Sequence, residues 1–138
     1  MLSEAFRASV IGPPASSRQT EAAGWKPAVQ AFLIAFDQTA NYSSPNFLWF
    51  RERFARFVYV DRIVVAEEAR KQGLARTLYQ DVFDAARAAG HERVACEVNY
   101  APPNSVSDAF HESLGFTEIG RAALAKDKGV RYLMASLT

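Results

Sequence analysis

The stretch "RKQGLARTLYQDVFDAARAAG" (residues 70–90) decides the fold expected for this chain. Leucine, valine and alanine recur at helical spacing from Leu74 to Ala89, and polar residues fill most of the other positions. Gly90 is suited to end a helix. At the opposite end, Gly73 stands among basic residues. The pattern predicts a long amphipathic helix whose N-terminus is flanked by positive charge.

The segments on either side of this helix have the composition of β-strands. "RFVYVDRIVV" (56–65) is rich in β-branched and aromatic residues, and "RVACEVN" (93–99) alternates apolar side chains. Strand, helix and strand in this order predict a parallel pair with a right-handed crossover. Asn104 can cap a second helix, and closing strands are predicted at 116–124 and 130–137. We therefore expect an α/β fold with a mixed, mostly antiparallel sheet and a central parallel pair.

The N-terminal part of the chain is less regular. "RASVIG" (7–12) and "AVQAFLIAF" (28–36) are predicted strands, and the second is short and apolar enough to be buried. Prolines, glycines and polar residues between them indicate a mobile loop at 12–27. "NYSSPNFLWFRERF" (41–54) is aromatic and is expected to form a loop with a helical turn.

The composition indicates one ordinary globular domain over residues 1–138. Hydrophobic residues make up 49% of the chain and charged residues 22%, and its 138 residues suffice for a single core. A net charge of +1 argues against nucleic acid as a partner, because such binding relies on clustered positive charge. No apolar run approaches the ~20 residues of a membrane span, so we expect no membrane partner.

Cysteine and histidine usage argues against several other kinds of site. The single cysteine, Cys96, cannot form an internal disulfide or a cysteine-based zinc site, and it alternates with valines as a core residue does. His91 and His111 are too far apart in the sequence for a local metal motif, so we expect no metal. His91 follows a glycine and is expected to be solvated in a turn. The lone thiol and the lack of a signal-peptide pattern favour a cytoplasmic location.

The entrance of the long helix has the chemistry of an anion site. The first N–H groups of a helix have no intrahelical partner and lie at the positive end of its dipole. Gly73 has no Cβ and allows a ligand to approach the backbone, while Arg70, Lys71 and Arg76 add positive charge. A plain turn with solvated charge is the alternative interpretation. The spacing matches neither a Walker phosphate loop nor a dinucleotide fingerprint.

Two segments resemble the GCN5-related N-acetyltransferase (GNAT) superfamily. "VDRIVVAEEARKQGLARTLY" is similar to the family's acetyl-CoA-binding segment, whose Arg/Gln-x-x-Gly-x-Gly/Ala signature matches Arg70, Gly73 and Ala75. "NSVSDAFHESLGF" is similar to its fourth helix, and together the resemblance covers residues 57–116. The first strand and first helix of the family have no counterpart here. This predicts either a truncated start or cover by another subunit, as in a homodimer.

The resemblance implies acetyl-CoA as the cofactor and a set of residues that hold it. The two parallel strands would splay and hold pantetheine against the backbone at 63–65, and the pyrophosphate would lie on the N–H groups of 70–75. The implied cofactor-binding residues are Ile63, Val64, Val65, Arg70, Lys71, Gln72, Gly73, Leu74, Ala75, Arg76, Asn104, Ser107 and Phe110.

Three residues are candidate catalytic groups. In the family a tyrosine on the fourth helix often protonates the departing thiolate, and His111 stands at that place, unless it only packs or caps the helix. Asp61 lies in the middle of an apolar strand and is expected to act as a base through water, or else to form a salt bridge. Glu97 on the next strand is the second candidate base, or a solvent-facing residue.

The function expected on these grounds is enzymatic. An acetyl-CoA-dependent N-acetyltransferase would acetylate a small amine by direct attack, without a covalent enzyme intermediate. The alternative is a non-enzymatic acyl-CoA-binding module with an incomplete acceptor site. A nucleotide-binding regulatory domain is less favoured, because no base- or ribose-recognition motif is visible. "DQTANYSSPNFLWF" (37–50) lines the acceptor pocket or packs as an aromatic core.

Overall fold

The computed structural model describes residues 7–11 and 29–137, and the mobile loop predicted at 12–27 lies outside them. Within this part the elements follow in chain order: β1 (Arg7–Ile11), β2 (Ala31–Asp37), α2 (Pro45–Arg51), β3 (Val58–Val65), the short 3₁₀ helix η1 (Glu67–Ala69), α3 (Leu74–Ala88), β4 (Arg93–Ala101), α4 (Ser105–Ser113), β5 (Phe116–Ala125) and β6 (Lys128–Ser136). Among these helices none is long and apolar enough to span a membrane.

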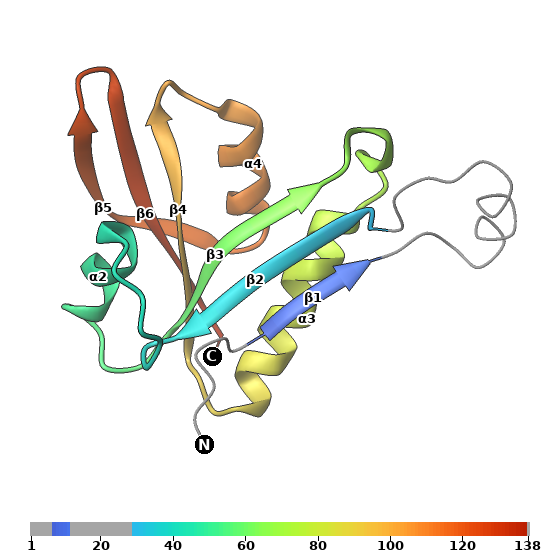
Figure 1. The fold of residues 1–138 in the computed structure, drawn as a ribbon, viewed down its shortest axis with the longest axis horizontal. Coiled ribbons are helices and arrows are strands. Elements are labelled where there is room, and N and C mark those ends of the chain that lie inside the picture. The colour runs from blue at the N-terminus through green and yellow to red at the C-terminus, as the bar shows by residue number, and fades with distance from the viewer. Residues whose placement is uncertain (1–6, 12–28, 138) are drawn as a thin grey trace, which may run out of the picture.

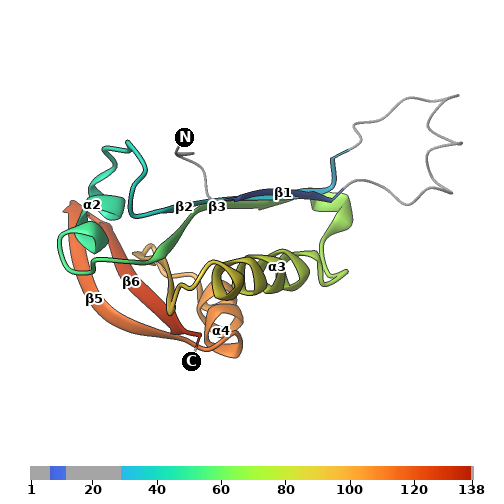
Figure 2. The same ribbon diagram turned by 90° about the horizontal axis from the view of Figure 1, so that it is seen from below.

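The strands form one six-stranded sheet in the order β1-β2-β3-β4-β6-β5 (Figure 1). Neighbouring strands are antiparallel except β3 and β4, which run parallel and are joined in the sequence by α3. Helices α3 and α4 lie on one side of the sheet, while α2 lies at the other side near β5 and β6 (Figure 2). The predicted α/β class, with a mostly antiparallel sheet and a central parallel pair, is confirmed.

The alternation of side chains along the strands divides the core between the two faces of the sheet. On one face, Val58 and Val94 pack with the apolar stripe of α3, and Cys96 belongs to this cluster, as predicted. On the other face, Tyr59 and Tyr132 pack with the buried aromatic residues of α2. Each face therefore has its own helix and its own apolar cluster, with the central strands between them.

The parallel pair is joined over a very short length. Only Val58 with Val94 and Tyr59 with Ala95 are paired between β3 and β4. Beyond these pairs β3 continues against β2, and β4 continues against β6. The two strands therefore diverge, as expected for a splayed pair, and each has one edge whose backbone groups are not engaged by the other.

Both helix ends predicted from the sequence are present. Gly73 is the N-cap of α3 with φ +77°, and Gly90 follows the helix with φ +83°. These left-handed conformations favour glycine because it has no Cβ. Asn104 caps α4, since its Oδ1 accepts the backbone N–H of Ser107 at 3.0 Å.

The expectation that His91 is solvated is wrong. The residue is only 7% exposed. The turn at Gly90 brings the chain back under the end of α3, where the His91 backbone N–H donates to the Ala86 carbonyl at 2.9 Å. Burial lowers the pKa of the ring, because desolvation disfavours the imidazolium form.

The aromatic cluster under α2 predicts a large stability effect at its centre. Phe50 is fully buried and lies against Phe57, Tyr59 and Tyr132. Phe50→Ala removes these contacts and leaves a cavity, so we expect the free energy of unfolding to fall by about 3–5 kcal/mol. Urea denaturation followed by tryptophan fluorescence measures the change. The matched control is Glu52→Ala at the exposed end of the same helix, which should change stability by less than about 0.5 kcal/mol.

Candidate functional site

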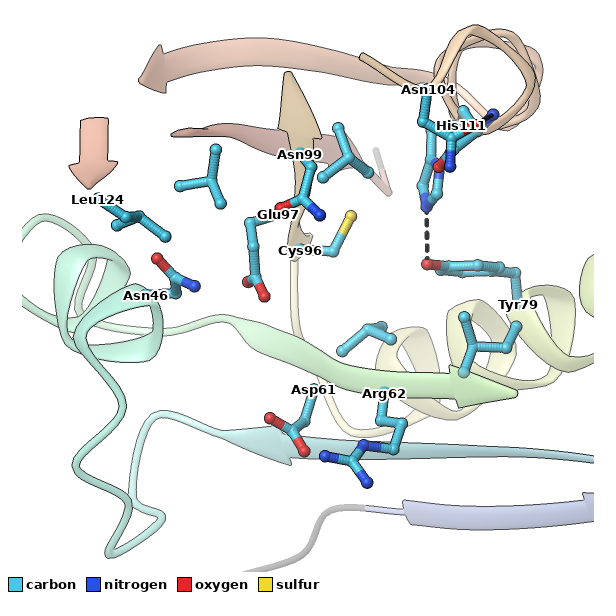
Figure 3. Close-up of a pocket in the computed structure, with 15 residues that line it drawn as sticks. Asn46, Asp61, Arg62, Tyr79, Cys96, Glu97, Asn99, Asn104, His111 and Leu124 are labelled. Atoms are coloured by element: carbon cyan, nitrogen blue, oxygen red, sulfur yellow. Dashed lines mark hydrogen bonds between the residues drawn. The ribbon is translucent and has the colours of Figure 1, made fainter. Parts of the chain in front are cut away.

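A cavity of about 440 Å³ opens where β3 and β4 diverge (Figure 3). Its wall includes all three predicted catalytic residues: Asp61 from β3, Glu97 from β4 and His111 from α4. Three of the predicted cofactor-binding residues also line it: Ile63, Asn104 and Ser107. The split in the sheet therefore brings together residues from β3, β4 and α4, and Asp61 is 36 positions from Glu97 and 50 from His111.

The two carboxylates occupy equivalent places just past the last strand pair. Tyr59 is paired with Ala95, and two residues further along each strand, on the same face, lie Asp61 and Glu97. Each acid accepts a hydrogen bond from a tyrosine: Tyr42 Oη donates to Asp61 Oδ1 at 2.7 Å, and Tyr59 Oη donates to Glu97 Oε1 at 2.6 Å. The partner of Asp61 in the described part of the chain is thus a tyrosine, and Glu97 lines the cavity.

Glu97 has the electrostatic character of a base that works near neutral pH. Burial raises its pKa to about 7, and the nearby charge of Asp61 raises it further, while hydrogen bonds from Tyr59 and Asn46 oppose the shift. A carboxyl group with this pKa is about half ionised at neutral pH. It can therefore both take up and release a proton under ordinary conditions.

His111 is buried and has both ring nitrogens engaged. Nδ1 lies 2.8 Å from the carbonyl oxygen of Ser107, and Nε2 lies 3.0 Å from the hydroxyl of Tyr79. A carbonyl can only accept, so Nδ1 carries the proton, and in the neutral ring Nε2 then accepts the hydrogen bond from Tyr79. Burial lowers the pKa of His111, although the bond to Ser107 and the charge of Asp108 act in the opposite direction. The ring is thus neutral in this arrangement.

Tyr79 is a site residue that the sequence analysis missed. It lies on α3, lines the cavity and is hydrogen-bonded to His111, as the dashed line in Figure 3 shows. The available signal was a tyrosine in the apolar stripe of an amphipathic helix. A buried tyrosine needs a partner for its hydroxyl, so such a position indicates a polar group on a neighbouring element.

A second cavity, of about 380 Å³, lies at the N-terminus of α3. The predicted residues that line it are Val65, Arg70, Lys71, Gly73, Leu74, Ala75, Arg76 and Phe110. The N-cap of α3 makes no side-chain cap, and a Cβ built on Gly73 would meet nothing within 4 Å, so the first backbone N–H groups face open space. This cavity has the donors, the room and the charge for a phosphate group.

Not every predicted residue reaches a cavity. Val64 and Gln72 line neither of the two, and the side chain of Val64 is 43% exposed. In the proposed acceptor segment, Asn46 lines the first cavity and Tyr42 binds Asp61, but Asp37 bonds locally to Thr39. The aromatic residues of that segment are mainly core, which was the alternative: Phe47, Trp49 and Phe50 pack in the cluster under α2.

The sequence and the fold both identify the family of this chain. A sequence model of the "Acetyltransferase (GNAT) family" matches residues 30–116. The protein therefore belongs to the GNAT family of acetyltransferases, as the resemblance had indicated. Among curated proteins, no match to this sequence is found.

Several solved structures share the fold at low sequence identity. The ribosomal-protein-S18-alanine N-acetyltransferase from Escherichia coli is 16% identical, with a TM-score of 0.61 over 96% of this chain and 95% of its own. The NatC complex bound to Gag peptide and CoA is 15% identical, with a TM-score of 0.64 over 86% of this chain and 67% of that chain. A streptothricin-type acetyltransferase structure from Bacillus anthracis, in complex with acetyl coenzyme A, is 17% identical with a TM-score of 0.59. That match covers 79% of this chain and 56% of the Bacillus chain.

The raised pKa of Glu97 can be measured directly. We expect the side-chain carboxyl carbon of Glu97 to titrate near pH 7 by NMR. Tyr59→Phe removes a hydrogen bond that stabilises the ionised form, so it should raise this pKa further. Glu118 serves as an internal control, because its bond with Arg121 holds its pKa below the usual value. A Glu97 titration midpoint near 4.5, or one that Tyr59→Phe leaves in place, would contradict this description.

Proposed function

We propose that this protein transfers an acetyl group from acetyl-CoA to the amine of a small molecule by direct attack. The observation that carries this proposal is Glu97, a carboxyl group with a pKa of about 7, at the point where the two parallel strands separate. The phosphate-sized cavity at the N-terminus of α3 supports the cofactor half of the proposal.

The residues around the split fit acetyl-CoA. The backbone edge of β3 around Ile63 and Val65 has no pairing with β4. In our proposal this edge would pair with the amide groups of pantetheine. The open N–H groups after Gly73, with the charges of Arg70 and Lys71, would hold the diphosphate. Val64 and Gln72 would then contribute through their backbone, because their side chains line neither cavity.

When bound, acetyl-CoA would supply a thioester carbon that an amine can attack and a thiol that can leave. In our proposal Glu97 removes the proton of the attacking amine, since its pKa suits proton transfer near neutral pH. Asp61, held by Tyr42 of the segment between β2 and α2, adds negative charge that favours a cationic amine beside the base. His111 is the source of the proton that the departing thiol needs.

The acceptor would enter on the α2 side of the first cavity. Asn46 of α2 lines this part together with Leu124 and Val130 of the β5–β6 hairpin. Asn46 is itself fixed, because its Oδ1 accepts a hydrogen bond from Tyr132 at 3.0 Å. These residues line the same cavity as Glu97, so in our proposal a compact amine would be held beside the base.

The cofactor site can be tested by isothermal titration with acetyl-CoA. Gly73→Glu places a carboxylate among the N–H groups that would hold the diphosphate, so we expect binding to be lost. Gly90→Glu is the matched control, because Gly90 has a similar positive φ but lies at the other end of α3. That control should bind acetyl-CoA as the wild type does. Equal affinity in wild type and Gly73→Glu would contradict the assignment of this cavity.

Turnover can be tested by thiol release from acetyl-CoA in the presence of a panel of small amines and short peptides. Glu97→Gln keeps a polar side chain of the same size but cannot accept a proton, so kcat should fall roughly 10²–10⁴-fold. The remaining rate should rise steadily with pH, as the free-amine fraction of the acceptor grows. Binding of acetyl-CoA without turnover of any amine would instead favour the non-enzymatic module. Turnover of peptides alone would contradict a small acceptor.

A further inference from the structure

Tyr79 and His111 form a connected pair, and only one of them has a hydrogen-bonding atom left for a ligand. The Nδ1 of His111 is bound to the Ser107 carbonyl and its Nε2 to the Tyr79 hydroxyl. His111 therefore has no free nitrogen that points into the cavity. The Tyr79 oxygen is bonded to His111 and also interacts with the Cys96 thiol, but a hydroxyl has one donor and two acceptor sites, so it keeps one further site for a ligand.

The pair is held in a fixed geometry by its surroundings. The Tyr79 ring lies 5.9 Å from Phe110 and 5.7 Å from Phe116, and the residue is only 1% exposed. The thiol side chain of Cys96 points toward the pair from β4, while the neighbouring Glu97 points toward α2 (Figure 3). The hydroxyl of Tyr79 thus points away from α3 into the cavity, beside His111 and Cys96, whereas the Glu97 side chain is turned toward α2 (Figure 3).

Proton affinities decide which member can be the source of a proton. A thiol such as that of CoA has an ordinary pKa of about 8.5, and a histidine one of about 6.5. Burial lowers the pKa of His111, so a proton moves downhill from His111 to a thiolate. Burial raises the pKa of Tyr79 well above its ordinary value, so an isolated Tyr79 would have to give up its proton uphill.

We propose that Tyr79 hands the proton to the departing sulfur and that His111 supplies it through Tyr79. This inference rests on the proposed acetyl transfer. In the starting state both ring nitrogens of His111 carry protons, and Nε2–H donates to the Tyr79 oxygen. As the C–S bond breaks, its electron pair stays on sulfur. Tyr79 O–H transfers its proton to the sulfur, and the Tyr79 oxygen takes the Nε2 proton of His111.

The proton balance closes without any further reactant. The attacking amine loses one proton to Glu97, and the thiol gains one from His111 through Tyr79. Glu97 then releases a proton to solvent and His111 takes one up before the next turnover. The arrangement in the structure, with Nε2 accepting from Tyr79, is the state after the proton has been delivered.

The charged groups that face His111 leave this transfer possible. Asp108 on α4 favours the protonated ring and Arg131 on β6 disfavours it. These two side chains form an ion pair at 3.2 Å, so their effects on the ring partly cancel. The Cys96 thiol on β4 has a pKa raised far above its ordinary value by burial, so it remains neutral.

The decisive experiment measures the thiol pKa of bound CoA, which requires no acceptor. The probe is CoA bound to the protein, and its thiol is titrated by following the ultraviolet absorbance of the thiolate. The complex with desulfo-CoA, which has no thiol, serves as the reference, because it carries the same tyrosine and cysteine signals. In the wild type the pKa should be lower than that of free CoA. Tyr79→Phe keeps the buried ring but removes the hydroxyl, so the pKa should rise by at least one unit, a tenfold loss of thiolate. Tyr100→Phe, whose hydroxyl lies outside the cavity, should have no effect.

The outcomes separate this inference from the proposed function. If wild-type protein does not bind CoA, the proposed function itself fails. If it binds CoA and Tyr79→Phe leaves the thiol pKa at the wild-type value, the proton path through Tyr79 is wrong. If Tyr79→Phe does not fold, His111→Gln replaces it: the amide can still accept from Tyr79 but has no proton to supply, so the thiol pKa should again rise toward the free value.

A second measurement uses the protein without ligand. Nitrogen-15 NMR of the histidine rings should show His111 as the Nδ1–H tautomer at pH 7.5, with a titration midpoint below 6.5. The Nε2–H tautomer would overturn the proposal, because the Nε2 atom would then donate to Tyr79 in the neutral state and no proton would pass between them.

Discussion

The fold depends on how briefly β3 and β4 are paired. Two residue pairs, Val58 with Val94 and Tyr59 with Ala95, join the two halves of the sheet, and both halves then continue separately. Parallel strands in a fully formed sheet would satisfy one another's backbone groups. Here those groups remain available at the centre of the molecule. The first cavity with its two carboxylates lies in the gap that this leaves, and the second cavity lies at the N-terminus of α3, beyond the end of β3.

Packing on both faces keeps the gap from closing. The apolar stripe of α3 supports β3 from one side, and the aromatic cluster under α2 supports β4 and β6 from the other. Trp49 of α2 stacks on Tyr132 of β6 at 4.1 Å, and a Cβ at Gly120 would come within 2.5 Å of the Trp49 ring. The hairpin and α2 thus fit closely, and both diverging strands are packed on each face, by the α3 cluster on one side and the α2 cluster on the other.

Much of the fold could be predicted because local patterns determine it. The periodicity of α3, the glycines at its ends and the capping position of Asn104 are properties of short segments, and the structure has all of them. The site was predictable only in part. Asp61, Glu97 and His111 were identified as chemistry-bearing residues, and they line one cavity. Their partners are harder to predict from local patterns, because Tyr42, Tyr59 and Tyr79 become partners only through tertiary contacts.

The same reason explains the misplacement of His91. A histidine after a glycine suggests a solvated turn, and only the return of the chain under α3 buries it. The alternation of side chains along a strand does carry a signal for Tyr59. Tyr59 and Asp61 are two positions apart, so they share a face of β3. Combined with the parallel partner strand, this alternation would have placed Tyr59 beside Glu97.

The alternation of side chains along β4 places neighbouring residues on opposite sides of the cavity. Cys96 faces α3 and α4, and Glu97 beside it faces α2 and the hairpin. Substitutions in α2 or the β5–β6 hairpin can therefore change the part of the cavity around Glu97, while the side chains that face α3 and α4 stay as they are. Under the proposed function, a change on the α2 side would alter which amine fits beside the base and would leave the residues that hold acetyl-CoA unchanged. The alternation of one strand would then allow acceptor preference and cofactor binding to vary independently.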